Sequence, residues 1–470
     1  MVDTVNKIFS PEEFVKAASG ETVGIGNFDY NTLVVSIDSR KCTPGCLFVA
    51  LKGEKTDGHF YIESALKRGA RNCLLSRSFW LHHKTELLNF QKLYNNGFVV
   101  VDEPLRALQS AASAYMLKLD SVLRIGVTGS SGKTTVKELI GSIFSRNQRT
   151  AVNEGNLNSE IGLSLAVFGV QDTHKYAVFE MGMNRIGEME ILSQIVRPDY
   201  AVITNIGSAH VGLLGSCDSI ALEKKKVFSF FDGGQKGFIY EKEKYFEFLA
   251  AGVKGEIVPF GPESLPGYSG SESLGLGGTL IRWEGIEIHF PLIGGYNLIN
   301  ALGAITVALH AGIDAQTIKA GLESAKPLFG RNEIIKGPVT IIQDCYNANP
   351  DSMAKALDFF DSLHWPGRKI LILGSMMELG DFSKEAHRSL GERVLKSSAD
   401  AVFLMGEEAG QIFKLIGQGQ FKGYCYWSEN FQALAEKAVD FTSPGDLVLV
   451  KGSRALELER ITEVLKERNR

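Results

Sequence analysis

The segment from Ile125 to Thr135 constrains this chain more than any other stretch of its sequence. An apolar run leads into the loop Thr-Gly-Ser-Ser-Gly-Lys-Thr-Thr, and a helical pattern follows over residues 136–144. In such a strand–loop–helix unit, backbone N–H groups and the helix N-terminus surround a phosphate chain. A plain glycine turn between a strand and a helix would need no lysine. The sequence therefore predicts a nucleoside triphosphate site.

The residues of this loop have separate expected tasks. Lys133 is expected to reach the terminal phosphates, and the hydroxyl of Thr134 is expected to bind Mg²⁺. Val127 stands where the strict motif has a glycine, so the loop is a variant form. The residues expected to hold ATP here are Gly129, Ser130, Ser131, Gly132, Lys133, Thr134 and Thr135.

Length and composition exclude several classes of protein. A chain of 470 residues with 44% hydrophobic and 22% charged residues is typical of a globular protein with about three domains. The formal net charge of −4 argues against a nucleic-acid binder. No apolar run is long enough to span a membrane, and no apolar block follows Asp3 and Lys7 as in a signal peptide. The six cysteines show neither metal-ligand nor disulfide spacing, which favours reduced thiols in a cytoplasmic protein.

The pattern of apolar residues divides the chain into three regions. The expected strands of the first region are 33–37, 47–51 and 72–75, and its expected helices are 61–68 and a connecting helix at 103–123. The middle region is expected to have strands at 176–179 and 200–204, helices at 136–144, 188–195 and 298–310, a loop at 267–278 and a small β excursion at 280–290. In the last region the expected strands are 339–343, 370–373, 401–405 and 447–450, and the expected helices are 353–363, 384–395, 431–439 and 456–468.

Alternating strands and helices predict an α/β protein with parallel sheets. We expect a small α/β N-terminal domain over residues 1–104, a central parallel-sheet domain with the phosphate loop over 105–328, and a Rossmann-like C-terminal domain over 329–470. The Gly-x-Gly-x-x-Gly fingerprint does not follow any strand of the last region, which argues against a dinucleotide site. Ligands of such sheets bind outside the carboxyl ends of the strands.

Three features near those strand ends carry candidate chemistry. Glu180 directly follows the apolar run 177–179, and a carboxylate there suits Mg²⁺, although a solvated glutamate is the plain alternative. His210 follows the strand expected at 200–204, where a structural and a ligating role are equally open. The run Lys224-Lys225-Lys226 reads as a solvated helix face, yet one neutral lysine could add carbon dioxide and become a carbamate ligand for a second metal ion. Spacing does not choose the lysine.

Six stretches of the chain resemble the Mur ligase family of ATP-dependent ligases. The resemblance covers essentially the whole chain, and the Tyr-Asn-Ala-Asn-Pro stretch is typical of the type that adds a D-alanyl-D-alanine dipeptide. The stretches are Leu51-Lys52-Gly53-Glu54 with Asp57-Gly58-His59; the loop TGSSGKTT; Glu180-Met181-Gly182-Met183-Asn184 with Thr204-Asn205-Ile206-Gly207; Asp344-Cys345-Tyr346-Asn347-Ala348-Asn349-Pro350; Leu373-Gly374-Ser375-Met376 with Glu378-Leu379-Gly380; and Lys451-Gly452-Ser453-Arg454.

The resemblance implies roles for individual residues. Lys133, Glu180, His210 and Lys224 would be catalytic, with Thr134, Glu180, His210 and Lys224 as metal ligands and Lys224 as the carbamylated lysine. Asn297 would contact adenine, Arg331 the ATP phosphate and Asp344 the ribose; the family commonly has histidine where Tyr296 stands. The residues implied to bind the other substrates are Ser39, Arg40 and Lys52 for the UDP end, Asn156, Asn158 and Ser159 for the path to the acceptor, and Asn347 and Asn349 for the dipeptide.

The implied reaction joins D-alanyl-D-alanine to a UDP-N-acetylmuramoyl tripeptide through an acyl phosphate, with ATP and two Mg²⁺ ions. The implied N-terminal domain binds the UDP substrate, the central domain binds ATP, and the C-terminal domain binds the dipeptide and completes the ATP site. We expect a cytoplasmic monomer whose partners are small molecules. Two alternatives remain at this point: a ligase of the same family that adds a single amino acid, and a switch protein that only hydrolyses nucleotide.

Overall fold

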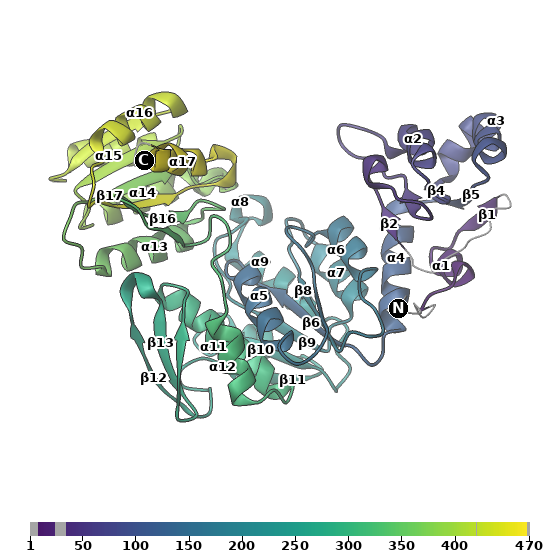
Figure 1. The fold of residues 1–470 in the computed structure, drawn as a ribbon, viewed down its shortest axis with the longest axis horizontal. Helices are drawn as coiled ribbons and strands as arrows, with labels where there is room; N and C mark the ends of the chain where they lie inside the picture. The colour runs from purple at the N-terminus through teal and green to yellow at the C-terminus, as the bar shows by residue number, and fades with distance from the viewer. Residues whose placement is uncertain (1–7, 24–33, 420, 468–470) are drawn as a thin grey trace.

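Three bodies follow one another along the chain in the computed structural model, which describes residues 8–23, 34–419 and 421–467 (Figure 1). Each body is built on one large β-sheet, and a small three-stranded sheet extends from the middle one. We call them the N-terminal, middle and C-terminal parts. The first and last parts lie on opposite sides of the middle part (Figure 1). The α/β class and the arrangement in three parts confirm the sequence prediction.

The N-terminal part holds a five-stranded sheet in the order β1-β5-β4-β3-β2. β1 pairs with β5 antiparallel, and the other neighbours are parallel. Its strands are β1 (Glu21–Val23), β2 (Val35–Ser36), β3 (Leu47–Val49), β4 (Asn72–Ser76) and β5 (Gly97–Val101). Its helices are α1 (Pro11–Ala17), η1 (Ser39–Lys41), η2 (Gly58–Tyr61), α2 (Ile62–Lys67) and α3 (Arg77–Tyr94).

The middle part holds a six-stranded parallel sheet in the order β11-β10-β9-β6-β8-β7. Helices α5, α11 and α12 pack on one face, and α4, α6 and α7 pack on the other. The strands are β6 (Leu123–Thr128), β7 (Thr150–Val152), β8 (Tyr176–Glu180), β9 (Tyr200–Ile203), β10 (Lys236–Tyr240) and β11 (Glu256–Phe260). The helices are α4 (Pro104–Leu117), α5 (Lys133–Phe144), α6 (Glu160–Val167), α7 (Glu188–Val196), α8 (Val211–Leu214), α9 (Cys217–Lys225), η3 (Lys226–Phe228), α10 (Phe246–Ala250), α11 (Gly295–His310) and α12 (Ala315–Glu323).

The small antiparallel sheet of the middle part corrects one expectation. Residues 267–278 were expected to form a loop, but β12 (Tyr268–Ser273) pairs there with β13 (Thr279–Trp283), which pairs in turn with β14 (Ile286–Phe290). β12 is an edge strand with no buried residue, so its glycines and serines carry no apolar alternation. Its pairing with β13 decides the structure, and the short η4 (Gly275–Gly277) forms the turn.

The C-terminal part holds a six-stranded sheet in the order β15-β16-β20-β17-β18-β19, parallel except for β15. Helices α13, α14 and α15 cover one face, and α16 and α17 cover the other. The strands are β15 (Glu333–Ile335), β16 (Thr340–Asp344), β17 (Lys369–Gly374), β18 (Ala401–Met405), β19 (Tyr424–Ser428) and β20 (Leu447–Lys451). The helices are α13 (Pro350–Ser362), η5 (Gly380–Phe382), α14 (Ser383–Val394), α15 (Gly410–Gln418), α16 (Phe431–Phe441), η6 (Arg454–Leu456) and α17 (Glu459–Glu467).

Most expected elements agree with these bounds, with differences at their ends. The connecting helix expected to reach residue 123 ends at Leu117, because Leu123 already begins β6. Residue 33 of the first expected strand, residue 468 of the last expected helix, and Asp3 and Lys7 lie outside the described residues. Within the described ranges, no helix combines the length and the apolar character that crossing a membrane requires.

Candidate active site

The phosphate loop lies between β6 and α5, and two of its glycines have conformations that other residues rarely adopt. Gly129 has φ of +148° and Gly132 has φ of +80°. A Cβ atom on Gly129 would lie 1.9 Å from Thr204 Oγ1, and one on Gly132 would lie 2.7 Å from Asn300 Oδ1. Both positions therefore require glycine, because the backbone φ is positive and because the side chains of Thr204 and Asn300 leave no room for a Cβ atom.

Hydrogen bonds fix the loop to the segment that follows β9. Ser130 N–H donates to the Asn205 carbonyl at 2.9 Å, and Ser131 N–H donates to Asn205 Oδ1 at 3.1 Å. Thr204 Oγ1 donates to the Ser131 carbonyl at 2.6 Å. Lys133 Nζ donates to the Gly129 carbonyl at 2.9 Å, and burial lowers the pKa of this lysine, partly opposed by the charge of Glu180. These hydrogen bonds hold the phosphate loop in one conformation, and the Lys133 side chain folds back onto the loop at Gly129.

Glu180 ends β8 beside this loop, with 3% of its surface exposed. Its two carboxylate oxygens accept hydrogen bonds from Thr134 Oγ1 at 2.7 Å and from Asn158 Nδ2 at 2.8 Å. The solvated alternative is therefore wrong for this residue. The carboxylate and the hydroxyl form a pair of hard oxygen ligands of the kind that Mg²⁺ takes together with phosphate oxygens.

Asn153 holds the backbone on both sides of this carboxylate. Its Oδ1 accepts from Glu180 N–H at 2.8 Å, and its Nδ2 donates to the Leu157 carbonyl at 2.8 Å and to the Glu180 carbonyl at 3.3 Å. The buried Lys137 donates to the Asn153 carbonyl at 2.7 Å. This network ties the end of β8 to the segment that carries Asn158.

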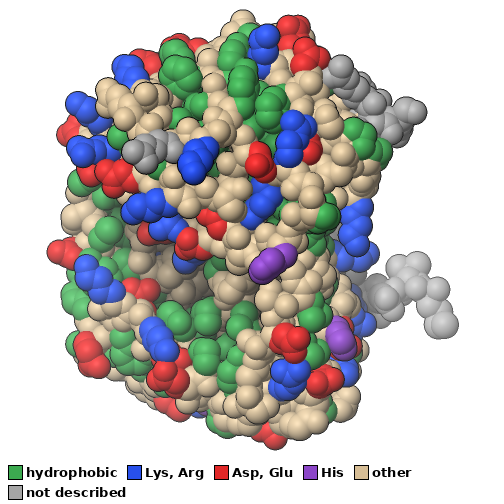
Figure 2. Space-filling view, turned by 90° about the vertical axis from the view of Figure 1, so that its left-hand side faces the viewer, with side chains coloured by type: hydrophobic (Ala, Val, Ile, Leu, Met, Phe, Trp, Pro, Cys, Tyr) green, Lys and Arg blue, Asp and Glu red, His purple; other side chains and the backbone are tan. Residues whose placement is uncertain are grey.

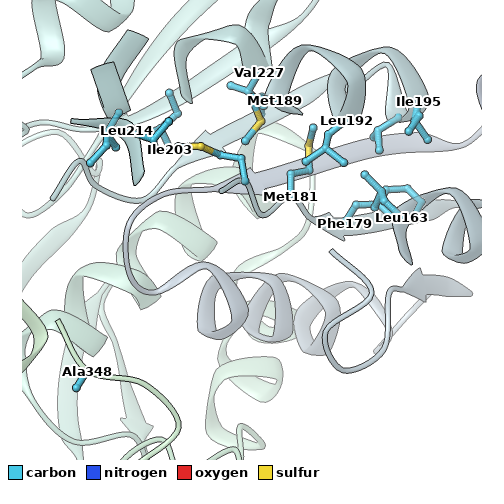
Figure 3. Packing of buried hydrophobic residues seen from close by; sticks show 14 of the residues in the cluster. Leu163, Phe179, Met181, Met189, Leu192, Ile195, Ile203, Leu214, Val227 and Ala348 are labelled. Atoms are coloured by element: carbon cyan, nitrogen blue, oxygen red, sulfur yellow. The ribbon is translucent and has the colours of Figure 1, made fainter. Parts of the chain in front are cut away.

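The opposite face of β8 anchors the strand in apolar core. Phe179 and Met181 alternate with Glu180 and lie among Leu163 of α6 and Leu192 of α7 (Figure 3). Because side chains alternate across a strand, this packing directs Glu180 to the α5 face, where Thr134 begins the helix. A packed core thus sets the direction of the carboxylate.

Lys224 and His210 are the two remaining predicted metal ligands, and only His210 is among the residues that line the neighbouring cavity. Lys224, near the end of α9, is 1% exposed, and burial together with the charge of Lys133 lowers its pKa well below the usual value. His210 has φ of +64°, and its Nδ1 lies 3.0 Å from Glu378 Oε2, without hydrogen-bond geometry. Burial and the charge of Lys133 lower the pKa of His210. The solvated-face reading of the lysine run is thus wrong for Lys224.

The middle and C-terminal parts meet close to these residues. Asp351 Oδ2 of α13 accepts from Ser208 N–H at 2.8 Å and from Ser208 Oγ at 2.9 Å. A Cβ atom on Gly212 of α8 would lie 2.5 Å from the nitrogen of Gly380 in η5, so main chain meets main chain there. The molecule is hollowed between the two parts (Figure 2), and a cavity of about 760 Å³ lies at this junction.

A buried histidine supports the C-terminal side of the junction. His387 Nε2 accepts from Met376 N–H at 2.9 Å, so Nδ1 carries the proton and donates to the Ser383 carbonyl at 2.7 Å. Burial lowers the pKa of His387, which is 0% exposed. The neutral ring thereby fixes the loop that leads to Glu378.

The cavity also brings together the residues predicted to bind the rest of ATP. Asn297, Arg331 and Asp344 all line it, together with the phosphate loop, Glu180 and His210. The Arg331 guanidinium lies 4.0 Å from the centre of the Tyr346 ring. Asp344 Oδ2 accepts from Lys451 Nζ at 2.6 Å. Two sheets thus contribute their carboxyl ends to one cavity.

The predicted acceptor and dipeptide residues are placed less uniformly. Asn158, Ser159, Asn347 and Asn349 line the cavity, but the exposed Asn156 is not among its lining residues. The Ser159 hydroxyl accepts from Gly162 N–H at 3.3 Å, and Asn349 Oδ1 accepts from Ser352 N–H at 2.8 Å. Both side chains therefore cap helices, α6 and α13, in this structure.

The residues predicted for the UDP end lie in the N-terminal part, away from this cavity. A second cavity of about 570 Å³ is lined by Lys52, His59 and Phe79 together with residues of α4 and Ile161 of α6. Ser39 and Arg40 do not line it: Ser39 is 7% exposed, and Arg40 pairs with Asp38 at 2.9 Å on the surface. All three residues follow the neighbouring parallel strands β2 and β3, and their role in binding the UDP end stays a prediction.

Sequence reasoning missed several residues that shape the site. Asn153 and Asn205 hold the loop and Glu180, Tyr346 stacks with Arg331, and Lys451 pairs with Asp344. Lys451 directly follows the strand predicted at 447–450 and belongs to the motif Lys451-Gly452-Ser453-Arg454, so the sequence already indicated a position at a strand end. Asn153 had none, because its partners come from 4 and 27 residues away.

Known proteins match this chain over more than nine-tenths of its length. The Mur ligase middle domain family matches residues 127–308, the Mur ligase glutamate ligase domain matches 330–454, and the Mur ligase family catalytic domain matches 33–85. The UDP-N-acetylmuramoyl-tripeptide–D-alanyl-D-alanine ligase of Treponema pallidum is 40% identical over 92% of this chain and 94% of its own length. The enzyme of the same name from Bacillus subtilis is 35% identical over 92% and 93%.

Solved structures give the same result. MurF from Acinetobacter baumannii superposes with a TM-score of 0.85 at 27% identity, covering 98% of this chain and 99% of that one. MurF ligase from Thermotoga maritima, in complex with ADP, gives a TM-score of 0.78 at 27% identity over 93% and 97%. With the site geometry and relatives of this identity and coverage, the chain belongs to the Mur ligase family.

Proposed function

We propose that this chain joins D-alanyl-D-alanine to a UDP-N-acetylmuramoyl tripeptide with ATP as the energy source, in peptidoglycan synthesis. The observation that carries the proposal is the cavity at the junction, where the phosphate loop and Glu180 of one part face Arg331, Asp344 and Asn347 of the chain beyond it. Relatives that cover more than nine-tenths of the chain bear the name of this activity. A protein that only hydrolyses nucleotide would not need residues for a second substrate, such as Asn347, in the same cavity as the phosphate loop.

We assign the three parts to the three substrates. Residues 1–104 bind the UDP end of the acceptor, for which the second cavity with Lys52 provides space. Residues 105–328 bind ATP, and residues 329–470 bind the dipeptide and close the ATP site. We further propose that the enzyme is cytoplasmic, because ATP and UDP-linked sugars are cytoplasmic, and that it acts as a monomer on small-molecule substrates.

The donor atoms around Glu180 fit a magnesium ion that is held partly by nucleotide phosphate. Among the described residues, no three His, Cys, Asp or Glu side chains are grouped to hold an ion by themselves. Glu180 and Thr134 would hold one Mg²⁺ together with phosphate oxygens, and His210 and a carbamate on Lys224 would hold a second. Bound Mg²⁺ neutralises phosphate charge when two anions must approach each other.

The buried amine of Lys224 supports the carbamate. A buried lysine prefers the neutral form, and a neutral amine has the free electron pair that adds to carbon dioxide. Addition forms an N–C bond and releases a proton, which leaves a carboxylate-like group with a negative charge. The nearby positive charge of Lys133 favours the carbamate over an ammonium.

The chain's own residues supply positioning and charge for the two steps. Lys133 and Arg331 neutralise the γ-phosphate while a carboxylate oxygen of the tripeptide attacks phosphorus and the bond to ADP breaks. The amine of the dipeptide then attacks the acyl carbon, the carbon–oxygen bond to phosphate breaks, and the amine loses a proton. Closure of the C-terminal part over the cavity excludes water, which would otherwise hydrolyse the acyl phosphate.

One assay tests the proposal against its rivals. Purified protein receives ATP, Mg²⁺ and the UDP-muramoyl tripeptide with either diaminopimelate or lysine as third residue, and phosphate release is followed with and without D-alanyl-D-alanine. We expect release and a pentapeptide product only with the dipeptide. Release that ignores the dipeptide would indicate a switch protein. A parallel reaction receives a UDP-muramoyl dipeptide and a single amino acid, and product formation there would indicate the other ligase type.

A further inference from the structure

The hydroxyl of Tyr296 is a buried polar group that has no role in the proposed reaction steps. Tyr296 is the second residue of α11, and its ring packs across Gly294, where an added Cβ would lie 2.7 Å from Tyr296 Cε1. Its Oη is buried and has no hydrogen-bond partner among the described residues. Buried hydroxyls are normally paired, so an unpaired one that lines a ligand cavity points to a ligand.

Asp344 provides the complementary group in the same cavity. Its Oδ2 is taken by Lys451 Nζ at 2.6 Å, whereas its Oδ1 has only the long contact of 3.5 Å from Asn332 Nδ2. Lys451 is 2% exposed and also contacts the Asn347 carbonyl at 3.4 Å, so it is fixed in place. One oxygen of Asp344 therefore has capacity for another donor.

The phenol is a donor in this environment. Burial and the charge of Asp344 raise the pKa of Tyr296 well above its usual value, so its proton stays in place at neutral pH. The Asn332 amide is near enough to oppose this shift in part, but its geometry does not form a hydrogen bond with the hydroxyl. Tyr296 and Asp344 thus offer an O–H donor and a carboxylate acceptor to a ligand in the cavity.

A hydroxyl group matches this combination, because it accepts one hydrogen bond and donates another. In ATP, hydroxyl groups occur only on the ribose. We propose that Tyr296 Oη donates a hydrogen bond to a ribose hydroxyl of ATP and makes this enzyme selective for ribonucleotides; the inference rests on the proposed ATP-dependent function. Tyr296 is then a specificity-determining residue, and Lys451 is a positioning residue for Asp344.

The test compares Tyr296→Phe with the wild type on ATP, 2′-deoxyATP and 3′-deoxyATP. We expect the variant to lose about five-fold in kcat/KM for ATP, the effect of one neutral hydrogen bond, through KM rather than kcat. Against the deoxynucleotide that lacks the contacted hydroxyl, the variant and the wild type should agree within two-fold. Equal losses on all three nucleotides, or a loss on none, would overturn the proposal.

Two further measurements separate this role from a structural one. Because Oη has no hydrogen-bond partner within residues 8–23, 34–419 and 421–467, Tyr296→Phe should keep or raise the midpoint of urea unfolding, and a lowered midpoint would also overturn the proposal. Tyr268→Phe is the matched control, since its hydroxyl contacts Ser271 in the small sheet, and it should leave all nucleotide constants unchanged. Calorimetry with ADP and its deoxy forms gives the same comparison if the wild type forms no pentapeptide, which would be a failure of the proposed function alone.

Discussion

Replacing Asn153 by alanine tests whether the network behind Glu180 holds the site. The side chain is 3% exposed and makes hydrogen bonds to Glu180 N–H and to the Leu157 carbonyl, both at 2.8 Å. Alanine leaves these two groups without partners, and each unpaired buried group costs about 1–3 kcal/mol. Water can enter from the exposed residues 154–156, so the lower end applies, and we expect a loss of about 2–3 kcal/mol in the free energy of unfolding.

Activity should fall together with stability. The Glu180 carboxylate keeps its contacts with Thr134 and Asn158, but the backbone that carries it is released in Asn153→Ala. A displacement of about 1 Å in a catalytic group costs roughly 100-fold in rate. We therefore expect kcat/KM to drop by about 10- to 100-fold at low Mg²⁺, with part of the loss recovered at high Mg²⁺.

The measurements are urea unfolding followed by circular dichroism and phosphate release over a range of Mg²⁺ concentrations. Asn147→Ala is the matched control, because Asn147 is exposed and its side-chain Nδ2 donates to Thr317 Oγ1 at 3.0 Å. The control should change the free energy of unfolding by less than about 0.5 kcal/mol. An Asn153→Ala protein that is as stable and as active as this control would refute the reasoning.

Three other predictions concern single residues. Lys133→Ala should abolish turnover, a loss on the order of 3 kcal/mol or more at the transition state, at an unchanged unfolding midpoint; near-normal phosphate release would contradict the loop assignment. Lys224→Ala should lose activity and regain part of it with acetate or propionate. Lys225→Ala should stay active, because the Lys225 amine donates hydrogen bonds to the Phe248 and Ala251 carbonyls. An active Lys224→Ala would remove Lys224 from the site. Burial lowers the pKa of His387 in the folded state, so the unfolded chain binds more protons than the folded chain below about pH 6.5. As the pH decreases below that value, this histidine should lower the free energy of unfolding by up to about 1.4 kcal/mol per pH unit. Urea unfolding between pH 5 and 7 checks this, and a slope equal to that of His387→Gln would contradict it.

The features that could be predicted from the sequence are those that depend on residues close together in the chain. The phosphate loop needs glycine at two positions and a lysine at the helix start, and all three stand within five residues of sequence. The apolar run before Glu180 likewise predicted a buried strand with a carboxylate at its end, because the apolar residues and the glutamate are adjacent in the sequence. The buried position of Lys224, in contrast, had no local signal beside two exposed-looking lysines.

Pairings over long separations were out of reach. Lys451 and Asp344 are 107 residues apart, and only the parallel pairing of β16 with β20 brings their strand ends together. The strand β12 was missed for a related reason, since its partner and not its own composition makes it a strand.

The contact between Gly212 and Gly380 limits how this joint can evolve. Any side chain at Gly212 would meet main-chain atoms at less than 3 Å, so every substitution there pushes the two parts away from each other. A natural variant can therefore widen the joint but cannot tighten it. An inhibitor that binds at this joint would contact peptide groups, which a mutation does not remove. A substitution at Gly212 that weakens inhibitor binding would also displace the two parts of the enzyme from each other.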